Sequence, residues 1–102
     1  MKVEWSHKAR TDLDEIFDYI LLENPQAAVD VLERIEQSTA RLADHPGMGR
    51  PGRVKSTREL IIPGIPYILP YLTGTKAITI VRVIHSSMQW PGSFYDTDIG
   101  PK

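Results

Sequence analysis

Residues 6–43, SHKARTDLDEIFDYILLENPQAAVDVLERIEQSTARLA, decide the fold of this chain. Ser6 stands where a helix N-cap is expected, because its hydroxyl can accept a bond from an early helical N–H. Apolar side chains then recur at helical spacing, at Ala9, Leu13, Ile16, Phe17 and Ile20. The opposite side is expected to carry Asp12, Asp14, Glu15 and Asp18. This pattern predicts a first helix over Lys8–Glu23.

A second helix follows with almost no loop. Asn24 is a good N-cap, and Pro25 fits the first helical position, where its missing N–H costs nothing. An apolar stripe then continues to the end of the quoted stretch. Two such helices are expected to pack as an antiparallel hairpin, and each still needs a further apolar surface.

That surface is predicted to be a sheet. Lys2–Trp5 is expected to be a short strand, and the glycine- and proline-rich segment His45–Ser56 cannot continue a helix. Three extended runs follow, at Thr57–Ile62, Tyr67–Leu72 and Ala77–Ile84. The last run is rich in β-branched residues, lacks proline and is apolar on both faces, which favours a central strand. The predicted fold class is α+β, in the order β-α-α-β-β-β, with the helical hairpin on one face of a small, mainly antiparallel sheet.

The composition limits the class of protein. The 102 residues, 41% hydrophobic and 25% charged, fit one globular domain, expected over residues 1–91 with an irregular tail over 92–102. No apolar run is long enough to span a membrane, and the N-terminus lacks the apolar stretch of a secretory signal, so we expect a cytoplasmic protein. The absence of cysteine excludes disulfides and thiol catalysis. His7, His45 and His85 share no ligand spacing, so neither a metal nor a cofactor is expected.

Charge is divided unevenly along the chain. Residues 1–48 hold five Lys and Arg against ten Asp and Glu, whereas residues 49–102 hold seven against three. Between Arg50 and Arg82, six basic residues accompany a single acid, Glu59. This asymmetry predicts a positive surface for an anionic partner, although ordinary solvated charge is the simpler explanation.

Several stretches, in this order, resemble the RelE/ParE superfamily of toxins from bacterial type II toxin–antitoxin modules, historically called plasmid-stabilisation proteins. They are EWSHKARTDLDEIFDYI, ENPQAA, HPGMGRPGR followed by TREL, PYILPY, and IVRVIHSSMQWP. The resemblance covers about residues 1–91. It implies a growth inhibitor neutralised by a cognate antitoxin that lays an acidic, apolar segment along the toxin. Operator DNA would be reached only through the antitoxin.

The superfamily divides by target. RelE-like members are ribonucleases that cut messenger RNA in the ribosome, whereas ParE-like members act on DNA gyrase without a known catalytic set. If this chain is RelE-like, the resemblance implies His85, Arg82 and Arg58 as catalytic residues. Arg82 and His85 would then need a bulge or turn near Ile84–Ser86, because a straight strand would point them to opposite faces. Ion pairing is the alternative role for Arg82, and bonding to the backbone for His85.

The charge favours the ParE-like branch. A sequence pI near 6.3 fits poorly with work on ribosomal RNA, where each neutralised phosphate adds affinity. The leading hypothesis is therefore a gyrase inhibitor, and this hypothesis favours a protein without an enzyme activity of its own. A RelE-like ribonuclease is the alternative, and a member that only binds its partner is a third. We expect the antitoxin to cover the open sheet face and the groove beside the helices, reaching Arg50, Arg53, Arg58, Arg82 and Trp90. Filling the edge of the core is the simpler role for Trp90.

Overall fold

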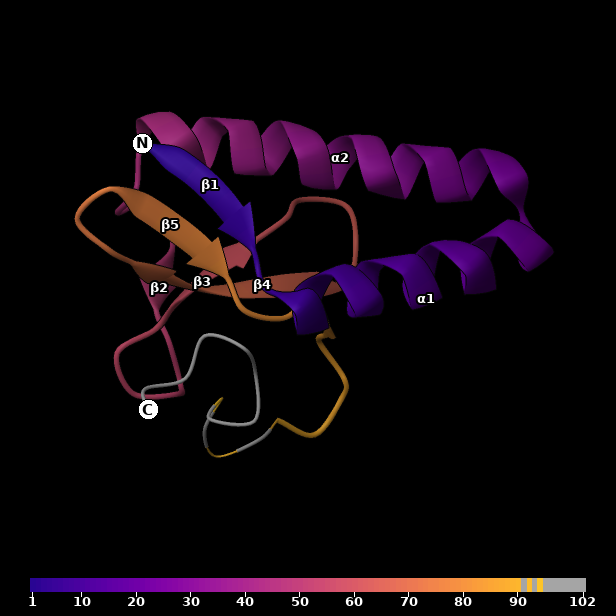
Figure 1. Ribbon diagram of the computed structural model, residues 1–102. Helices are drawn as coiled ribbons and strands as arrows, with labels where there is room; N and C mark the ends of the chain where they lie inside the picture. The colour runs from indigo at the N-terminus through magenta and orange to yellow at the C-terminus, as the bar shows by residue number, and fades with distance from the viewer. Residues whose placement is uncertain (91, 93, 95–102) are drawn as a thin grey trace.

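The computed structural model describes residues 1–90, 92 and 94, and it has the predicted α+β architecture (Figure 1). The helices are α1 (His7–Glu23) and α2 (Pro25–Asp44). The strands are β1 (Lys2–Trp5), β2 (Arg50–Pro51), β3 (Arg58–Ile61), β4 (Tyr67–Thr73), β5 (Ala77–Ile80) and β6 (Ile84–His85). The single domain expected over residues 1–91 stays a prediction, and the tail expected over 92–102 lies, apart from Gly92 and Phe94, outside the described residues.

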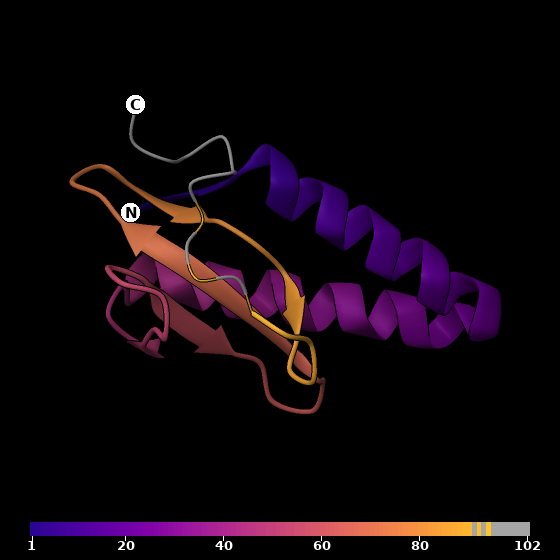
Figure 2. The same cartoon turned by 90° about the horizontal axis from the view of Figure 1, so that it is seen from below.

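The helical hairpin forms as the caps predict. Ser6 Oγ accepts the N–H of Ala9 at 3.0 Å, and Asn24 Oδ1 accepts the N–H of Ala27 at 3.2 Å. Pro25 occupies the first turn of α2. The two helices run side by side, and their junction extends beyond the end of the sheet in both views (Figures 1 and 2). The outer half of the hairpin therefore has no sheet beneath it.

The sheet has the strand order β1-β5-β4-β3-β2, with β6 paired to β4. β1 runs parallel to β5, and the other pairs are antiparallel. The run chosen as the central strand forms β5, which lies inside the sheet but next to the β1 edge. β4 lies at the centre although it contains Pro70, and the short strand β2 has no counterpart in the prediction.

Two apolar clusters cover the two faces of the sheet. The larger lies under the helices, where Ile35 and Leu42 of α2 pack against Leu69, Tyr71 and other sheet residues. The smaller lies on the opposite face and consists of Val54, Val81, Ile84 and Phe94, with Leu72 and Trp90 packed against it. The face expected to be open is thus partly covered by the chain itself.

The predicted strand over Ala77–Ile84 is interrupted, and Pro70 explains where. Continuing the register Tyr71↔Ile80 by one step places Pro70 opposite Val81. The N–H of Val81 donates to the carbonyl of Pro70 at 2.9 Å, but Pro70 has no N–H to return the bond. The hydroxyl of Ser6 donates to the carbonyl of Val81 instead, at 2.9 Å.

Beyond this point the register shifts by one residue. Tyr71 pairs with Ile80, whereas Ile68 pairs with Ile84, so a step of three residues on β4 faces a step of four. The extra residue makes a β-bulge at 81–83, slightly before the position that sequence reasoning required. Because the extra residue resets the alternation of faces, Arg82 and His85 both point to the side of α1.

Candidate functional site

The bulge is fixed by a carboxylate from α1. Asp12 Oδ2 accepts Arg82 Nε at 2.6 Å and the N–H of Val83 at 3.0 Å, and Oδ1 accepts Arg82 Nη2 at 3.2 Å. The Asp12 and Arg82 side chains are 12% and 20% exposed. The prediction that Asp12 lies on the solvent side of its helix is therefore wrong. Its carboxylate instead accepts the backbone N–H that the bulge frees. The ion pair is the alternative that sequence reasoning weighed for Arg82.

His85 lies beside this pair, in a cavity of about 340 Å³ that Asp12, Glu15, Tyr19, Tyr67 and Arg82 help to line. Its ring meets that of Tyr67 edge to face, with the centroids 5.4 Å apart. The N–H of Ser87 donates to Nδ1 of His85 at 3.1 Å, and the Ser87 hydroxyl lies 2.7 Å from the same nitrogen. With Nδ1 accepting a backbone bond, a neutral ring carries its proton on Nε2, which makes Nε2 a donor.

The phenol of Tyr67 completes the wall of this cavity. Burial and, to a lesser degree, the neighbouring Tyr19 raise the pKa of Tyr67 above its ordinary value. Tyr67 therefore lines the cavity as a neutral phenol.

The basic residues of β2 and the following loop surround Glu59, a carboxylate on β3 that is 1% exposed. Arg50 Nη2 lies 2.9 Å from Oε1, and Arg53 gives Oε2 both its backbone N–H at 2.8 Å and its Nε at 3.2 Å. Burial acts to raise the pKa of Glu59, but these hydrogen bonds and the charge of Arg53 outweigh it and hold that pKa below its ordinary value. Two guanidinium groups thus share one carboxylate and leave one positive charge uncompensated.

Trp90 lies next to this cluster, at the edge of the smaller apolar cluster. The guanidinium carbon of Arg53 lies 3.9 Å from a ring centroid of Trp90, at cation–π distance. The indole Nε1 is buried and has no hydrogen-bond partner among the described residues. Arg50, Arg53 and Trp90 therefore form one surface, on the face opposite the helices.

Arg58 is used differently from the other arginines. Its Nη1 donates to the carbonyl of Gly49 at 2.7 Å, and so holds the loop after α2. Arg58 pairs with Tyr71 and His85 pairs with Tyr67, which lie four residues apart on β4, or about 13 Å along a strand. The structure thus brings Arg82 and His85 together but does not bring Arg58 to them.

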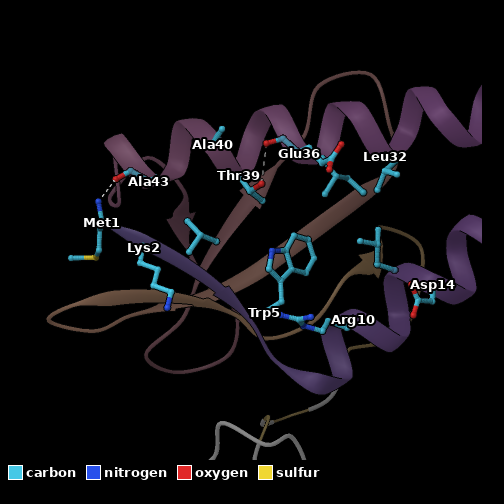
Figure 3. Close-up of a pocket in the computed structure, with 13 residues that line it drawn as sticks. Met1, Lys2, Trp5, Arg10, Asp14, Leu32, Glu36, Thr39, Ala40 and Ala43 are labelled. Atoms are coloured by element: carbon cyan, nitrogen blue, oxygen red, sulfur yellow. Dashed lines mark hydrogen bonds between the residues drawn. The ribbon is translucent and has the colours of Figure 1, made fainter.

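A second, larger cavity of about 790 Å³ opens at the free edge of β1 (Figure 3). Trp5 of β1 and Leu32 of α2 supply apolar walls, and charged side chains such as Arg10 and Glu36 stand at its rim (Figure 3). The N-terminal ammonium group donates to the carbonyl of Ala43 at 2.8 Å, which ties β1 to the end of α2. This cavity is the groove beside the helices that sequence reasoning anticipated.

Other kinds of site find no support within residues 1–90, 92 and 94. No three His, Asp or Glu side chains there could hold a metal ion together. No helix among them is long and apolar enough to cross a membrane.

Sequence reasoning missed the roles of Asp12 and Glu59. Asp12 lies three residues after Ala9 and four before Ile16, inside the apolar stripe of α1. That position was the available signal for a half-buried carboxylate. Glu59 was noted as the single acid in a basic stretch, and its central place between Arg50 and Arg53 explains that pattern.

Comparisons with known proteins agree with this architecture. A sequence profile described as the ParE toxin of the type II toxin–antitoxin system parDE matches residues 3–90. Y4kP, a candidate toxin of Sinorhizobium fredii, is 44% identical over 90 residues, which cover 88% of this chain and 93% of that protein. Toxin RelE2 of Caulobacter vibrioides is 30% identical over 86 residues, which cover 84% and 96%.

Toxin ParE1 of the same bacterium is 29% identical over 84 residues, which cover 81% of this chain and 86% of that toxin. A solved structure described as the chromosomal ParDE system from P. aeruginosa matches with a TM-score of 0.75 at 30% identity, over 83% of this chain and 95% of that one. Relatives on both branches of the superfamily therefore have similar identities to this chain.

Proposed function

Because the chain belongs to the ParE toxin family of type II toxin–antitoxin systems, with a cognate antitoxin as its partner, we propose that it inhibits growth by acting on DNA gyrase. The observation that carries this proposal is the Asp12–Arg82 pair. An RNA-cleaving site needs a cation at the scissile phosphate, and the guanidinium of Arg82 is already neutralised by a carboxylate. That carboxylate would also repel the phosphate.

The geometry of His85 supports the same choice. A general base needs a free nitrogen lone pair in reach of the substrate hydroxyl. Nδ1 of His85 already accepts the N–H of Ser87, so the lone pair of this nitrogen is engaged within the chain.

Two observations favour the alternative, a RelE-like messenger RNA endonuclease. The bulge brings Arg82 and His85 to the same cavity, beside the phenol of Tyr67. Toxin RelE2 of C. vibrioides is also among the relatives of this chain.

The substitution His85→Ala separates the two functions. As a gyrase inhibitor, the variant arrests growth at nearly the same induction level as the parent protein. A general acid or base contributes roughly 100- to 10,000-fold to a rate, so loss of toxicity on that scale, with antitoxin binding intact, would favour the ribonuclease. Ser87→Ala is the matched control, because it removes the neighbouring hydroxyl and keeps the imidazole.

For the antitoxin, we propose an acidic, apolar segment that uses two surfaces. The first is the face with Arg50, Arg53 and Trp90, where the side chains of Arg50 and Arg53 remain 52% and 45% exposed. The second is the apolar groove at the β1 edge. Arg58 and Arg82, which already bind acceptors within the chain, are expected to contribute less.

Replacing Arg50 and Arg53 with Gln tests this docking. We expect antitoxin binding to weaken by roughly tenfold or more and to depend less on salt. The control is Lys76→Gln together with Lys8→Gln, which removes the same charge at two exposed positions that do not line the groove. Equal losses in the two variants would point to net charge rather than to this face.

A further inference from the structure

The outer half of the helical hairpin carries apolar side chains that the fold leaves in water. Leu22 is 88% exposed and Tyr19 is 68% exposed. Both residues lie in the half of α1 that leads to the helix junction, and this junction extends beyond the sheet (Figures 1 and 2). Such exposure contributes nothing to folding, and contiguous exposed apolar groups mark contact sites for other molecules.

These side chains form one patch with acidic neighbours. Asp18 and Tyr19 follow Glu15 by three and four residues, and Leu22 follows them by four and three, which places all of them on one side of α1. We call this group the tip face. Glu15 and Tyr19 also line the 340 Å³ cavity that His85 helps to form, so the tip face borders this cavity.

The charge around the tip face is of one sign. Residues 11–33 contain seven acidic residues and no Lys or Arg. Asp12 is paired with Arg82. No ion pair within the described residues involves the other six, Asp14, Glu15, Asp18, Glu23, Asp30 and Glu33.

This charge selects among possible occupants. An acidic antitoxin segment would be repelled here, and so would the same tip of a second copy. A segment with apolar and basic side chains fits both the exposed rings and the carboxylates. Its apolar side chains would cover Tyr19 and Leu22, and its basic side chains would pair with Glu15 and Asp18.

We propose that the tip face binds a basic, apolar segment of the protein that this toxin inhibits, on a surface separate from the one that binds the antitoxin. The inference rests on the proposed function for the identity of that target, DNA gyrase. It does not require His85 to act as a catalyst. It implies that toxicity and neutralisation can be separated by substitution.

Two variants test the tip face. The first, Tyr19→Gln with Leu22→Gln, removes the apolar groups and keeps good helix propensity at Leu22. The second, Glu15→Gln with Asp18→Asn, removes two charges. The matched control is Glu4→Gln with Asp44→Asn, two exposed acids on β1 and at the other end of α2. Each variant is examined for growth arrest on induction, inhibition of supercoiling by purified gyrase, affinity for the purified antitoxin and thermal unfolding.

We expect both tip variants to unfold and bind antitoxin as the parent does, while growth arrest and gyrase inhibition need roughly 10- to 100-fold more toxin. The control variant should keep full activity. Unchanged growth arrest in both tip variants, or a parent protein that does not arrest growth, would overturn the inference. So would weaker antitoxin binding or a change of oligomeric state in the tip variants, because another occupant would then use this face.

The experiment also separates this inference from the proposed target. If the parent arrests growth but leaves gyrase untouched, while the tip variants lose the arrest, the gyrase assignment fails. In that case the tip face remains the target-binding surface.

Discussion

The substitution Asp12→Ala removes the carboxylate that fixes the bulge. It leaves the Arg82 guanidinium, 20% exposed, without its counter-ion and the freed N–H of Val83 without an acceptor. Three hydrogen bonds are lost, two of them from a charged group. Breaking a fully buried ion pair costs about 3–5 kcal/mol, and partial exposure lowers that figure, so we expect a loss of about 2–3 kcal/mol in the free energy of unfolding.

For a domain of this size, that loss corresponds to a fall in Tm of roughly 10–20 °C. The assay is urea unfolding followed by circular dichroism, with Asp14→Ala as the control. Asp14 is an exposed acid two residues away on the same helix, and its replacement is expected to change stability by less than about 0.5 kcal/mol. Both substitutions change helix propensity equally, so the difference between them isolates the Asp12 contacts.

A double-mutant cycle with Arg82→Ala completes the measurement. If the pair acts as described, the two substitutions together cost about 1–3 kcal/mol less than their sum. Equal stabilities of the Asp12→Ala and Asp14→Ala variants, or strictly additive losses in the cycle, would refute the reasoning.

Three further predictions follow from buried polar contacts. Because the pKa of Glu59 is lowered in the folded state, its ionised carboxylate stabilises the fold at pH values above its unfolded pKa, and this stability is lost as the pH falls through the folded pKa. In the Glu59→Gln variant, the urea concentration at the unfolding midpoint should therefore change less between pH 7 and pH 3 than in the parent protein. Tyr71→Phe removes bonds to the Gly49 N–H and the Pro46 carbonyl and should cost about 1–3 kcal/mol in chemical unfolding. Ser6→Ala removes both the N-cap of α1 and the hydrogen bond from the Ser6 hydroxyl to the carbonyl of Val81. Its calorimetric Tm should therefore fall further than that of Asn24→Ala, which removes only the N-cap of α2.

Local sequence determined the helices well. Ser6, Asn24 and Pro25 mark the helix starts through interactions within a few residues, and the apolar spacing fixes the buried side. These signals depend on neighbours along the chain, so they can be identified before any tertiary structure is known.

The break between β5 and β6 could not be located in the same way. It requires Pro70 to lie opposite Val81, which depends on the register of two strands and on the position of Ser6 beyond β1. The Asp12–Arg82 contact joins residues 70 positions apart and forms only after α1 lies over that break. Sequence reasoning identified the need for a bulge and ion pairing as an alternative role for Arg82, but the acid that pairs with it follows from packing.

The most direct test of the account is inhibition of purified DNA gyrase by the parent protein and by His85→Ala, measured as loss of supercoiling over a range of toxin concentrations. We predict that both proteins inhibit with midpoints within about threefold of each other and that added antitoxin relieves the inhibition in both. Unimpaired supercoiling in the presence of the parent protein, together with cleavage of ribosome-bound messenger RNA that depends on His85, would contradict it.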